Sequence, residues 1–323
     1  MNKLFLIDGN AIIHRAFHAI PKHFTSPEGD MINAVYGFAS MLLNIINIQH
    51  PTHIAVSFDR KAKTFRHKEY AEYKATRKKA PDELYSQIPL IRDLVTTFNM
   101  PIYDMDGFEA DDVLGTLSVQ ASKIPDTETY IVTGDMDTLQ LVTDKVKVFA
   151  PQGGFSNAVT YTPAKVEEKY GLKPSQIIDY KALRGDSSDN IPGVPGIGDK
   201  GAVRLLQQYI TLDAVYENLD EITGSIHDKL ADNKDLAYKS QYLATIVLDV
   251  PRELNLAECK THEYDKEKVQ ALFESLGFDS LIRKLHHEDR GIPVKNLEST
   301  SKAQSQSEPA PQPTPTTPQQ SLF

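Results

Sequence analysis

Residues 4–10 read LFLIDGN and residues 129–137 read TYIVTGDMD. In each stretch a short apolar run, rich in Ile, Leu, Val and aromatic residues, ends in an aspartate, Asp8 or Asp135. The same pattern recurs in IAVSFDR at 54–60, where the aspartate is Asp59. Runs of this length and composition predict buried β-strands. Helical patterns lie between them, which favours an α/β fold with a mostly parallel sheet.

The same periodicity predicts the remaining elements. Further strands are expected at 100–105 and 145–150, and helices at 34–48, 83–98 and 110–123. A proline inside the second of these helices predicts a kink or a late start. After about residue 160 the strand signals fade, and helices are expected at 163–171, 174–185, 199–209, 212–219, 234–247 and 266–277.

These patterns divide the chain into three segments. We expect an α/β core at 1–160, with a basic segment at 60–85, and a helical region at 161–290. The third segment, 291–323, is a tail in which residues 299–323 are rich in Ser, Gln, Pro and Thr. Such a composition buries too little apolar surface to fold, so we expect disorder there.

Composition narrows the class of protein. The chain has 323 residues and a net charge of −9. It has no apolar run of eighteen residues, and its start lacks the features of a secretory signal, so we expect a cytoplasmic protein. The single cysteine, Cys259, excludes an internal disulfide and a zinc site built from cysteines.

Acidic residues gather in four motifs, and they are the strongest functional signal. They are Asp8, Asp59, Glu109, Asp111, Asp112, Asp135, Asp137, Asp186 and Asp189. In a parallel sheet the carboxyl ends of the strands form one edge, where such side chains meet. Clustered carboxylates repel unless they are neutralised, and hard cations such as Mg²⁺ or Mn²⁺ prefer oxygen ligands. This pattern predicts two metal ions that hydrolyse a phosphodiester. Asp112 has an alternative role, capping its helix.

A basic segment follows Asp59 directly. Residues 60–79 contain nine Lys and Arg against two Glu, a local charge of +7. Lys63 and Arg66 are among the cations that are candidates for contacts with nucleic-acid phosphates. Phe65, Tyr70 and Tyr73 lie between the cations, and any of them is available to stack on an unpaired base. A solvated helix face is the alternative.

Residues 193–209 read GVPGIGDKGAVRLLQQY and predict a helix-hairpin-helix motif within 190–208. Gly196 and Gly198 let the backbone approach a phosphate, and amides at a helix start attract the anion. Lys200 adds charge. Contacts of this kind bind duplex DNA without reading its sequence. A generic glycine-rich turn is the alternative.

Five strings carry a resemblance to a known family: LIDGNAIIHRAFHA, FDRKAKTFRHKEYAEYKATR, GFEADDVLGTLS, VTGDMDTLQLV and GDSSDNIPGVPGIGDKGA. Over roughly residues 3–285 the chain resembles the 5′-nuclease domain of bacterial DNA polymerase I, within the flap endonuclease family. The resemblance implies a PIN-like, Rossmann-like core with a helix-three-turn-helix motif. It also implies 5′-flap endonuclease and 5′-3′ exonuclease activity on DNA in replication and repair, including RNA-primer and Okazaki fragment processing.

The resemblance also implies roles for individual residues. Asp8, Asp59, Glu109 and Asp111 would hold the first Mg²⁺, and Asp135, Asp137, Asp186 and Asp189 the second. Lys74, Arg77 and Arg15 would act on the scissile phosphate, and Tyr73 would stack on the displaced base. Gly196, Gly198 and Lys200 would grip duplex DNA, with K⁺ held by backbone carbonyls. The chain departs from the family pattern at two places. It has Lys78-Lys79-Ala80 where the family often has proline after the basic pair, and Gly201 where the family usually has threonine after the hairpin lysine.

The last five residues read QQSLF. They are similar to the pentapeptides with which bacterial replication proteins engage the sliding clamp, through Gln319, Ser321, Leu322 and Phe323. Chance in a Gln- and Ser-rich tail is the alternative. If the pentapeptide binds the clamp, we expect a free-standing nuclease and not a fragment of a polymerase.

Two rival functions remain open at this point. One is a catalytically silent module that binds structured DNA, which lost metal ligands would favour. The other is a ribonuclease of the wider metal-dependent nuclease group with a similar sheet. The hairpin and the basic segment favour branched DNA as substrate.

Overall fold

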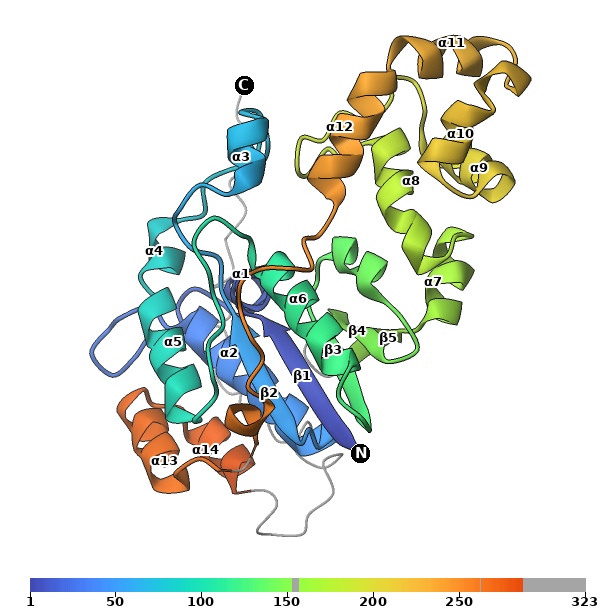
Figure 1. Cartoon of the computed structure of the whole chain (residues 1–323). Helices are drawn as coiled ribbons and strands as arrows, with labels where there is room; N and C mark the ends of the chain where they lie inside the picture. Colours follow the sequence, from blue (N-terminus) through green and yellow to red (C-terminus); the bar gives the residue numbers. More distant parts are fainter. Residues whose placement is uncertain (153–156, 262, 287–323) are drawn as a thin grey trace, which may run out of the picture. The chain divides into compact units, whose positions relative to one another are not determined.

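The structure is a computed structural model that describes residues 1–152, 157–261 and 263–286 (Figure 1). Residues 1–285 form one compact unit. Among the described residues, no helix combines the length and the apolar character needed to cross a membrane. The clamp-like pentapeptide lies outside the described residues.

A five-stranded sheet forms the centre of this unit. Its strands are β1 (Asn2–Asp8), β2 (His53–Ser57), β3 (Thr127–Val132), β4 (Val146–Gln152) and β5 (Asn157–Tyr161), in the order β2-β1-β3-β4-β5. The first four strands run parallel, and β5 is antiparallel to β4. The predicted fold class, a mostly parallel sheet flanked by helices, is confirmed.

Strand β1 separates two hydrophobic cores. Successive side chains of a strand point to opposite faces, so Phe5 and Ile7 pack in one core while Leu4 and Leu6 pack in the other. All four side chains are buried, and each contributes about 1.5–3 kcal/mol of burial free energy. These apolar residues fix β1 in the centre of the sheet and so place its last residue, Asp8, at the carboxyl edge.

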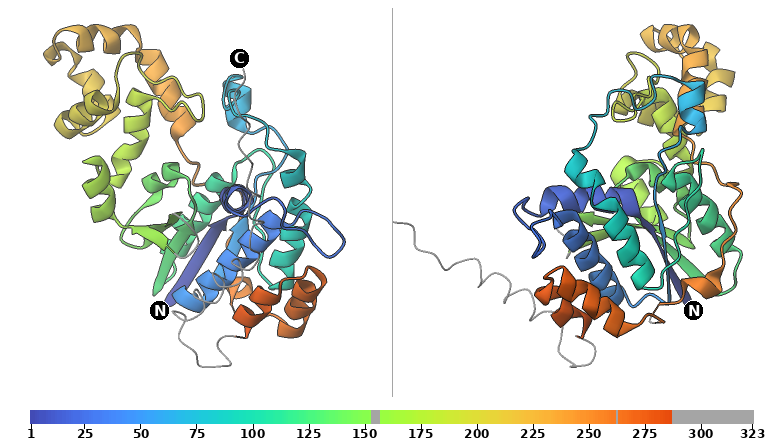
Figure 2. Two further views of the ribbon diagram at one scale, coloured as in Figure 1. Left: turned by 180° about the vertical axis from the view of Figure 1, so that it is seen from behind. Right: turned by 90° about the vertical axis from the view of Figure 1, so that its left-hand side faces the viewer.

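Helices cover both faces of the sheet, as Figures 1 and 2 show from three sides. The first core packs α1, α2, α5, α13 and α14, and the second packs α6. The bounds of these helices are α1 (Gly9–Ala19), α2 (Asn33–Asn44), α5 (Ile88–Thr97), α6 (Ala110–Ser122), α13 (Lys266–Ser275) and α14 (Asp279–Leu285). Short helical turns are α3 (Phe65–Glu69), α4 (Asp82–Tyr85), the π-turn η1 (Ile45–Gln49) and the 3₁₀ turns η2 (Met136–Leu141) and η5 (Leu256–Cys259).

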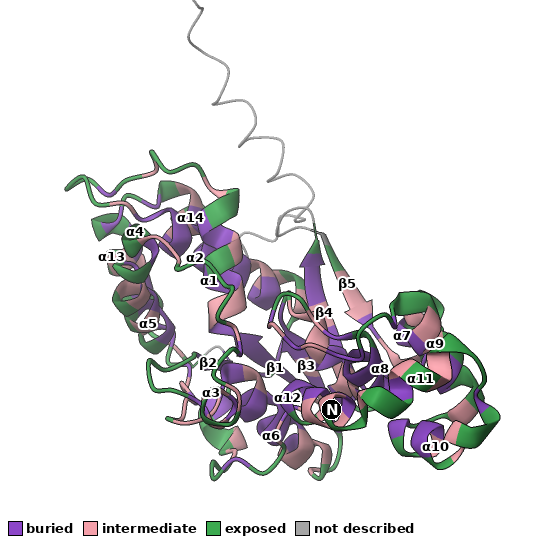
Figure 3. Ribbon diagram, turned by 90° about the horizontal axis from the view of Figure 1, so that it is seen from above, coloured by how far each residue is buried: buried purple, intermediate pink, exposed green. Residues whose placement is uncertain are grey.

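A second group of helices has a core of its own. It comprises α7 (Pro163–Tyr170), η3 (Pro174–Gln176), α8 (Ile177–Arg184), α9 (Asp199–Tyr209), α10 (Leu212–Glu217), η4 (Leu219–Glu221), α11 (Ser225–Asp232) and α12 (Lys234–Ala244). Leu183, Leu206 and Leu230 are among its buried residues. In Figure 3 these helices show buried inner faces and exposed outer faces. The predicted helical region is therefore present. Its boundaries at residues 161 and 290 remain a prediction.

One local prediction was wrong, one strand was not predicted, and one prediction was confirmed. The stretch 100–105 is not a strand, because only Ile102 makes a bridge, to Val56 of β2. Strand β5 was not predicted. The helix predicted at 83–98 divides into α4 and α5, and Pro89 lies in the first turn of α5, as a late start requires.

Candidate active site

Three aspartates from three strand ends lie together. Asp8 ends β1, and its carboxylate accepts hydrogen bonds from the Ala11 amide at 3.0 Å and the Thr133 hydroxyl at 2.7 Å. Burial raises the pKa of Asp8 to about 7, and the nearby charges of Asp59 and Asp135 act in the same direction. The parallel sheet thus gathers acids that are far apart in the sequence at its carboxyl edge.

The start of α6 adds two more acids. Asp59 accepts a hydrogen bond from the Ala110 amide at 2.8 Å, which ties the end of β2 to the first turn of α6. Glu109 precedes that turn and Asp111 lies in it. One carboxylate oxygen of Asp111, Oδ1, is buried and makes no hydrogen bond within the described part of the chain. Burial and the neighbouring carboxylates raise the pKa of Asp111 well above its usual value.

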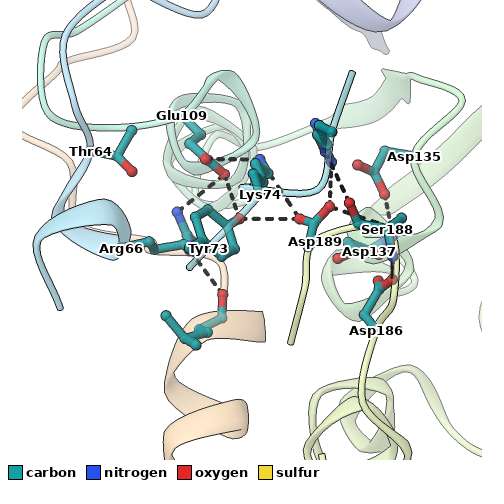
Figure 4. Close-up of polar contacts among 12 residues, drawn as sticks. Thr64, Arg66, Tyr73, Lys74, Glu109, Asp135, Asp137, Asp186, Ser188 and Asp189 are labelled. Carbon is teal, nitrogen blue, oxygen red and sulfur yellow. Dashed lines mark hydrogen bonds and ion pairs between the residues drawn. The ribbon is translucent and has the colours of Figure 1, made fainter. Parts of the chain in front are cut away.

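Two cations reach these carboxylates from the basic segment. Lys74 Nζ lies 2.8 Å from Glu109 Oε1 and 3.7 Å from Asp189 Oδ2 (Figure 4). The Arg77 guanidinium bonds Asp189. Lys74 has a φ of 57°, a region that non-glycine residues rarely adopt. Its amide donates to the Asp189 carbonyl at 2.9 Å, which holds this conformation. The backbone therefore fixes Lys74 beside the acids.

A third group of acids surrounds Lys181 of α8. Its ammonium pairs with Asp137 and with Asp186, the latter at 2.5 Å. Burial and the charge of Asp135 raise the pKa of Asp137, although Lys181 opposes them. Burial also acts to raise the pKa of Asp186, but the hydrogen bond and charge of Lys181, together with hydrogen bonds from Ser188, outweigh it and lower that pKa to about 2. Asp135, Asp137, Lys181 and Asp186 line a pocket of about 570 Å³.

The carboxylates of the site are suitable ligands for hard divalent cations, but in this conformation they are not arranged around a single ion. Within the described residues, no three His, Cys, Asp or Glu side chains converge to hold one ion. Lys74, Arg77 and Lys181 bond the carboxylates there instead. The acids supply only oxygen ligands, the type that Mg²⁺ and Mn²⁺ prefer. Asp111 has a carboxylate oxygen without a partner among the residues that the structure describes, and the pKa of Asp8 is raised. A bound cation would stabilise the ionised form of both carboxylates.

Arg66 and Asp112 do not have the roles predicted for them. Arg66 was expected to contact DNA, but only 2% of its side chain is exposed. It forms two hydrogen bonds of 2.8 Å with Asp112 and donates to the Leu243 carbonyl at 2.9 Å. Asp112, expected as a metal ligand, also accepts from the Glu109 and Val247 amides, so its oxygens are occupied. Its alternative role, capping α6, is what the structure contains.

Tyr73 is placed differently from the prediction as well. Its ring was expected to stack on a displaced base, but only 4% of the residue is exposed. The hydroxyl donates to Glu109 at 3.1 Å and to Asp189 at 3.2 Å. In this conformation the ring is a buried support for the two carboxylates, and it offers no face to a base.

The other predicted DNA contacts lie on the surface. Lys63 is exposed and Arg15 is half-buried. Gly196, Gly198 and Lys200 form an exposed turn at the start of α9. Gly196 has a φ of +83°, which favours glycine, and its carbonyl accepts from Lys229 at 3.1 Å. This turn has the exposure that a phosphate contact requires.

Sequence reasoning missed two site residues. Lys181 links two acidic motifs, and Thr133 links Asp8 to the Asp135 amide. A single lysine in an amphipathic helix usually reaches solvent, so the sequence carried no signal for Lys181. Thr133 stands between a strand and an acid, and only the three-dimensional pairing reveals its partner.

Comparison with solved structures shows a shared fold. The T5 5′-exonuclease with bound divalent zinc ions matches with a TM-score of 0.63 at 18% identity, over 89% of this chain and 98% of that one. The catalytic core of Rad2 in complex with DNA substrate matches with a TM-score of 0.56 at 15% identity, over 88% and 92%. At these identities the likeness concerns the fold alone.

Sequence relatives are closer. DNA polymerase I of Caldicellulosiruptor bescii is 45% identical over 285 residues, which are 88% of this chain and 33% of that protein. DNA polymerase I of Bacillus subtilis is 44% identical over 284 residues, 88% and 32%. The chain thus spans about a third of the length of these relatives.

Two family models cover most of the chain. The model of the 5′-3′ exonuclease N-terminal resolvase-like domain matches residues 3–171, and that of the 5′-3′ exonuclease C-terminal SAM fold matches residues 172–267. The matched ranges contain the acidic motifs, Lys74, Arg77 and the hairpin turn. The chain therefore belongs to the 5′-3′ exonuclease family of nucleases.

Proposed function

We propose that this chain is a structure-specific nuclease that hydrolyses DNA phosphodiesters at 5′ flaps and 5′ ends. The observation that supports it is the grouping of acids and cations in the candidate active site. Carboxylates from four motifs come together near the carboxyl edge of the sheet, with Lys74 and Arg77 among them. Acids and cations in one site suit a phosphodiester, because the cations neutralise its charge while the acids hold metal ions.

Two divalent ions, Mg²⁺ with Mn²⁺ as a substitute, belong to this proposal. Asp8, Asp59, Glu109 and Asp111 would hold one ion, and Asp135, Asp137, Asp186 and Asp189 the other. Bound ions supply Lewis acidity toward water and toward the phosphate oxygens. Lys181 positions Asp137 and Asp186 before an ion binds, because its ammonium contacts both carboxylates.

Lys74 and Arg77 would bind the scissile phosphate. Both now bond carboxylates, so substrate binding exchanges one anionic partner for another. Their positive charge then stabilises the charge that develops on the phosphate in the transition state. Half-buried Arg15 of α1, the helix that follows Asp8, would contribute a further contact.

Duplex DNA would bind at the exposed turn that begins α9. Lys200 offers a phosphate contact, and Gly196 and Gly198 allow close approach of the backbone. A K⁺ ion held by carbonyls of this turn is part of the proposal, as is Lys63 as a phosphate contact. Such contacts read no bases, so specificity would come from the branched shape of the DNA.

The substrates would include 5′ flaps and RNA-primed DNA in replication and repair. We propose that the chain acts as a cytoplasmic monomer at the nucleoid. The pentapeptide at 319–323 would engage the sliding clamp and raise the local concentration of the nuclease on DNA. Removing Gln319–Phe323 is then expected to leave free cleavage intact and to abolish stimulation by the clamp, whereas equal stimulation of the truncated chain would contradict this part of the proposal.

The deciding experiment is cleavage of a labelled double-flap DNA, in magnesium and in EDTA, with products resolved to one nucleotide. A magnesium-dependent cut at or within about one nucleotide of the junction is expected. Asp135→Ala should abolish the cut and keep duplex binding, while the exposed Asp144→Ala serves as a matched control with normal turnover. Binding without a cut, in magnesium and in manganese, would instead favour the silent DNA-binding module.

A further inference from the structure

A second hollow lies away from the pocket beside Lys181. Its volume is about 240 Å³, and its lining consists of Phe65, Phe108, Tyr242, Thr245 and Val247. The Phe65 ring lies 6.1 Å from the Phe108 ring and 5.9 Å from the Tyr242 ring, measured between centroids. Tyr242 is 51% exposed. Three aromatic rings from α3, α12 and the segment before α6 thus surround one open hollow, the aromatic pocket.

Buried bonds hold the aromatic pocket against the acidic site. Phe65 precedes Arg66, whose guanidinium bonds Asp112 and donates to the Thr245 carbonyl at 2.6 Å. Phe108 precedes Glu109, one of the site carboxylates. Figure 4 shows Arg66 between Glu109 and the α12 side. The rings are therefore pre-organised, and ligand binding there loses little conformational entropy.

The surroundings of the aromatic pocket are cationic. The Arg66 guanidinium lies 4.5 Å from the Phe65 centroid. Lys239 is one helical turn before Tyr242 on α12, and its ammonium lies over Tyr70 at 4.9 Å. Exposed Lys63 stands two residues before Phe65. Of the acids beneath, Asp112 is paired with Arg66 and Glu109 with Lys74, while Glu69 and Glu72 remain on the surface.

The shape and chemistry of the hollow indicate the ligand. A pocket of this volume is smaller than those that enclose a drug-sized molecule, so it suits a single flat ring system. The Thr245 hydroxyl already donates to the Gln241 carbonyl at 2.7 Å, so this side chain is not free to donate to a base edge. Aromatic faces set among cations are how proteins bind single-stranded nucleic acid without reading sequence.

We propose that the aromatic pocket is a subsite for an unpaired nucleobase of the 5′ single strand, stacked against Tyr242 with its phosphates near Lys63 and Lys239. This inference rests on the proposed function, because it assigns part of that substrate to a place on the surface. It also gives the flap an aromatic partner that buried Tyr73 does not provide.

The test measures binding in EDTA, which requires no cleavage. Fluorescence anisotropy compares a nicked duplex with the same duplex carrying a 5′ flap of five nucleotides. Tyr242→Ala should weaken binding of the flap substrate about tenfold and leave the nicked duplex unchanged, since one stacked base is lost. Tyr242→Phe keeps the ring and should bind normally, whereas Tyr242→Leu keeps only apolar bulk and should bind as weakly as the alanine variant. The exposed Tyr85→Ala, outside the pocket, is the matched control.

Photocrosslinking locates the base directly. Flaps with 5-iodouracil at each position in turn are irradiated with the wild-type chain in EDTA, and the crosslinked peptide is sequenced. At least one flap position should crosslink to Tyr242, Phe65 or Phe108. Crosslinks that map only elsewhere, or flap affinity that is unchanged in Tyr242→Ala, would overturn the subsite. Full affinity of Tyr242→Leu would also overturn it, because apolar contact rather than stacking would then suffice. Failure of cleavage in magnesium affects neither readout, so the two proposals fail separately.

Discussion

Arg66 and Asp112 form a buried, bidentate ion pair in which each of the two terminal guanidinium nitrogens lies 2.8 Å from one carboxylate oxygen. The side chains are 2% and 0% exposed. Arg66 comes from α3 and Asp112 from the first turn of α6, and the same guanidinium donates to carbonyls at the end of α12. This pair therefore ties the basic segment, the acidic site and the helical region to one another.

The first prediction concerns this pair. Arg66→Met should lower the free energy of unfolding by about 3–5 kcal/mol, because it leaves the Asp112 carboxylate buried without a counter-charge. Urea denaturation followed by circular dichroism measures the loss. Lys68→Met, on the exposed side of the same helix, is the control and should change stability by less than about 0.5 kcal/mol. A midpoint for Arg66→Met equal to that of the wild type would show that the pair does not stabilise the fold.

The second prediction concerns Lys74 and Arg77. Removal of either cation, by Lys74→Ala or Arg77→Ala, should lower single-turnover cleavage of a flap substrate about a hundredfold, because a charge that stabilises the transition state is lost. The neighbouring Lys78 is exposed, and Lys78→Ala supplies the matched control with nearly normal chemistry. If Lys78→Ala slowed cleavage as much as Arg77→Ala, only the total charge of the segment would matter.

Features that depend on a short stretch of sequence were predicted correctly, above all the strands and the acids that follow them. Asp8, Asp59 and Asp135 were placed at one sheet edge because each follows its own apolar strand, and strand ends in a parallel sheet share an edge. The failed strand at 100–105 has the composition of a strand, but it contributes only isolated bonds beside β2, through the Pro101 carbonyl and the Tyr103 amide. Composition cannot distinguish a bridged extended segment from a full ladder.

Pairings across long sequence separations could not be predicted. A basic stretch has the same sequence pattern whether each cation faces solvent or a buried acid. The sequence therefore could not distinguish buried Arg66 from the exposed cations around it. Its partner Asp112 is 46 residues away. Tyr73 likewise finds Asp189 across 116 residues, and Lys181 finds Asp137 across 44. These contacts depend on how two cores pack, which a local pattern does not encode.

The third prediction is a pH dependence that originates at Asp179 of α8. Its buried carboxylate accepts hydrogen bonds from the Gln241 side chain at 2.6 Å and the Leu212 amide at 3.0 Å. Burial raises the pKa of Asp179 despite these bonds. A carboxyl whose pKa is raised by folding prefers to be protonated in the folded state, so ionisation costs stability. The cost is absent below the unfolded pKa and complete above the folded pKa.

Asp179→Asn tests this assignment, because the amide is similar in shape and does not ionise. The stability of the variant relative to the wild type should increase as the pH rises from about 4 to 7. Urea midpoints of both proteins at the two pH values give that difference, and comparison at each pH cancels the titration of all other groups. A difference that does not change with pH, or that decreases, would show that Asp179 ionises in the fold without cost.

The last prediction contrasts two glycines of the hairpin region that a sequence cannot rank. Gly193 has a φ of +64°, and a Cβ there would lie 2.2 Å from the Gly185 amide nitrogen and 2.6 Å from the Arg184 carbonyl carbon. Because both obstacles are backbone atoms, Gly193→Ala should destabilise the chain by about 2 kcal/mol or more.

Gly201 lies inside α9, where a Cβ would meet only the Ile197 side chain, at 3.4 Å. Gly201→Ala should therefore stabilise by about 0.5–1 kcal/mol, since alanine loses less backbone entropy in a helix. Thermal unfolding of both variants measures the two signs, and a shift in the same direction for both would mean that the turn relaxes around a side chain instead of requiring glycine at residue 193.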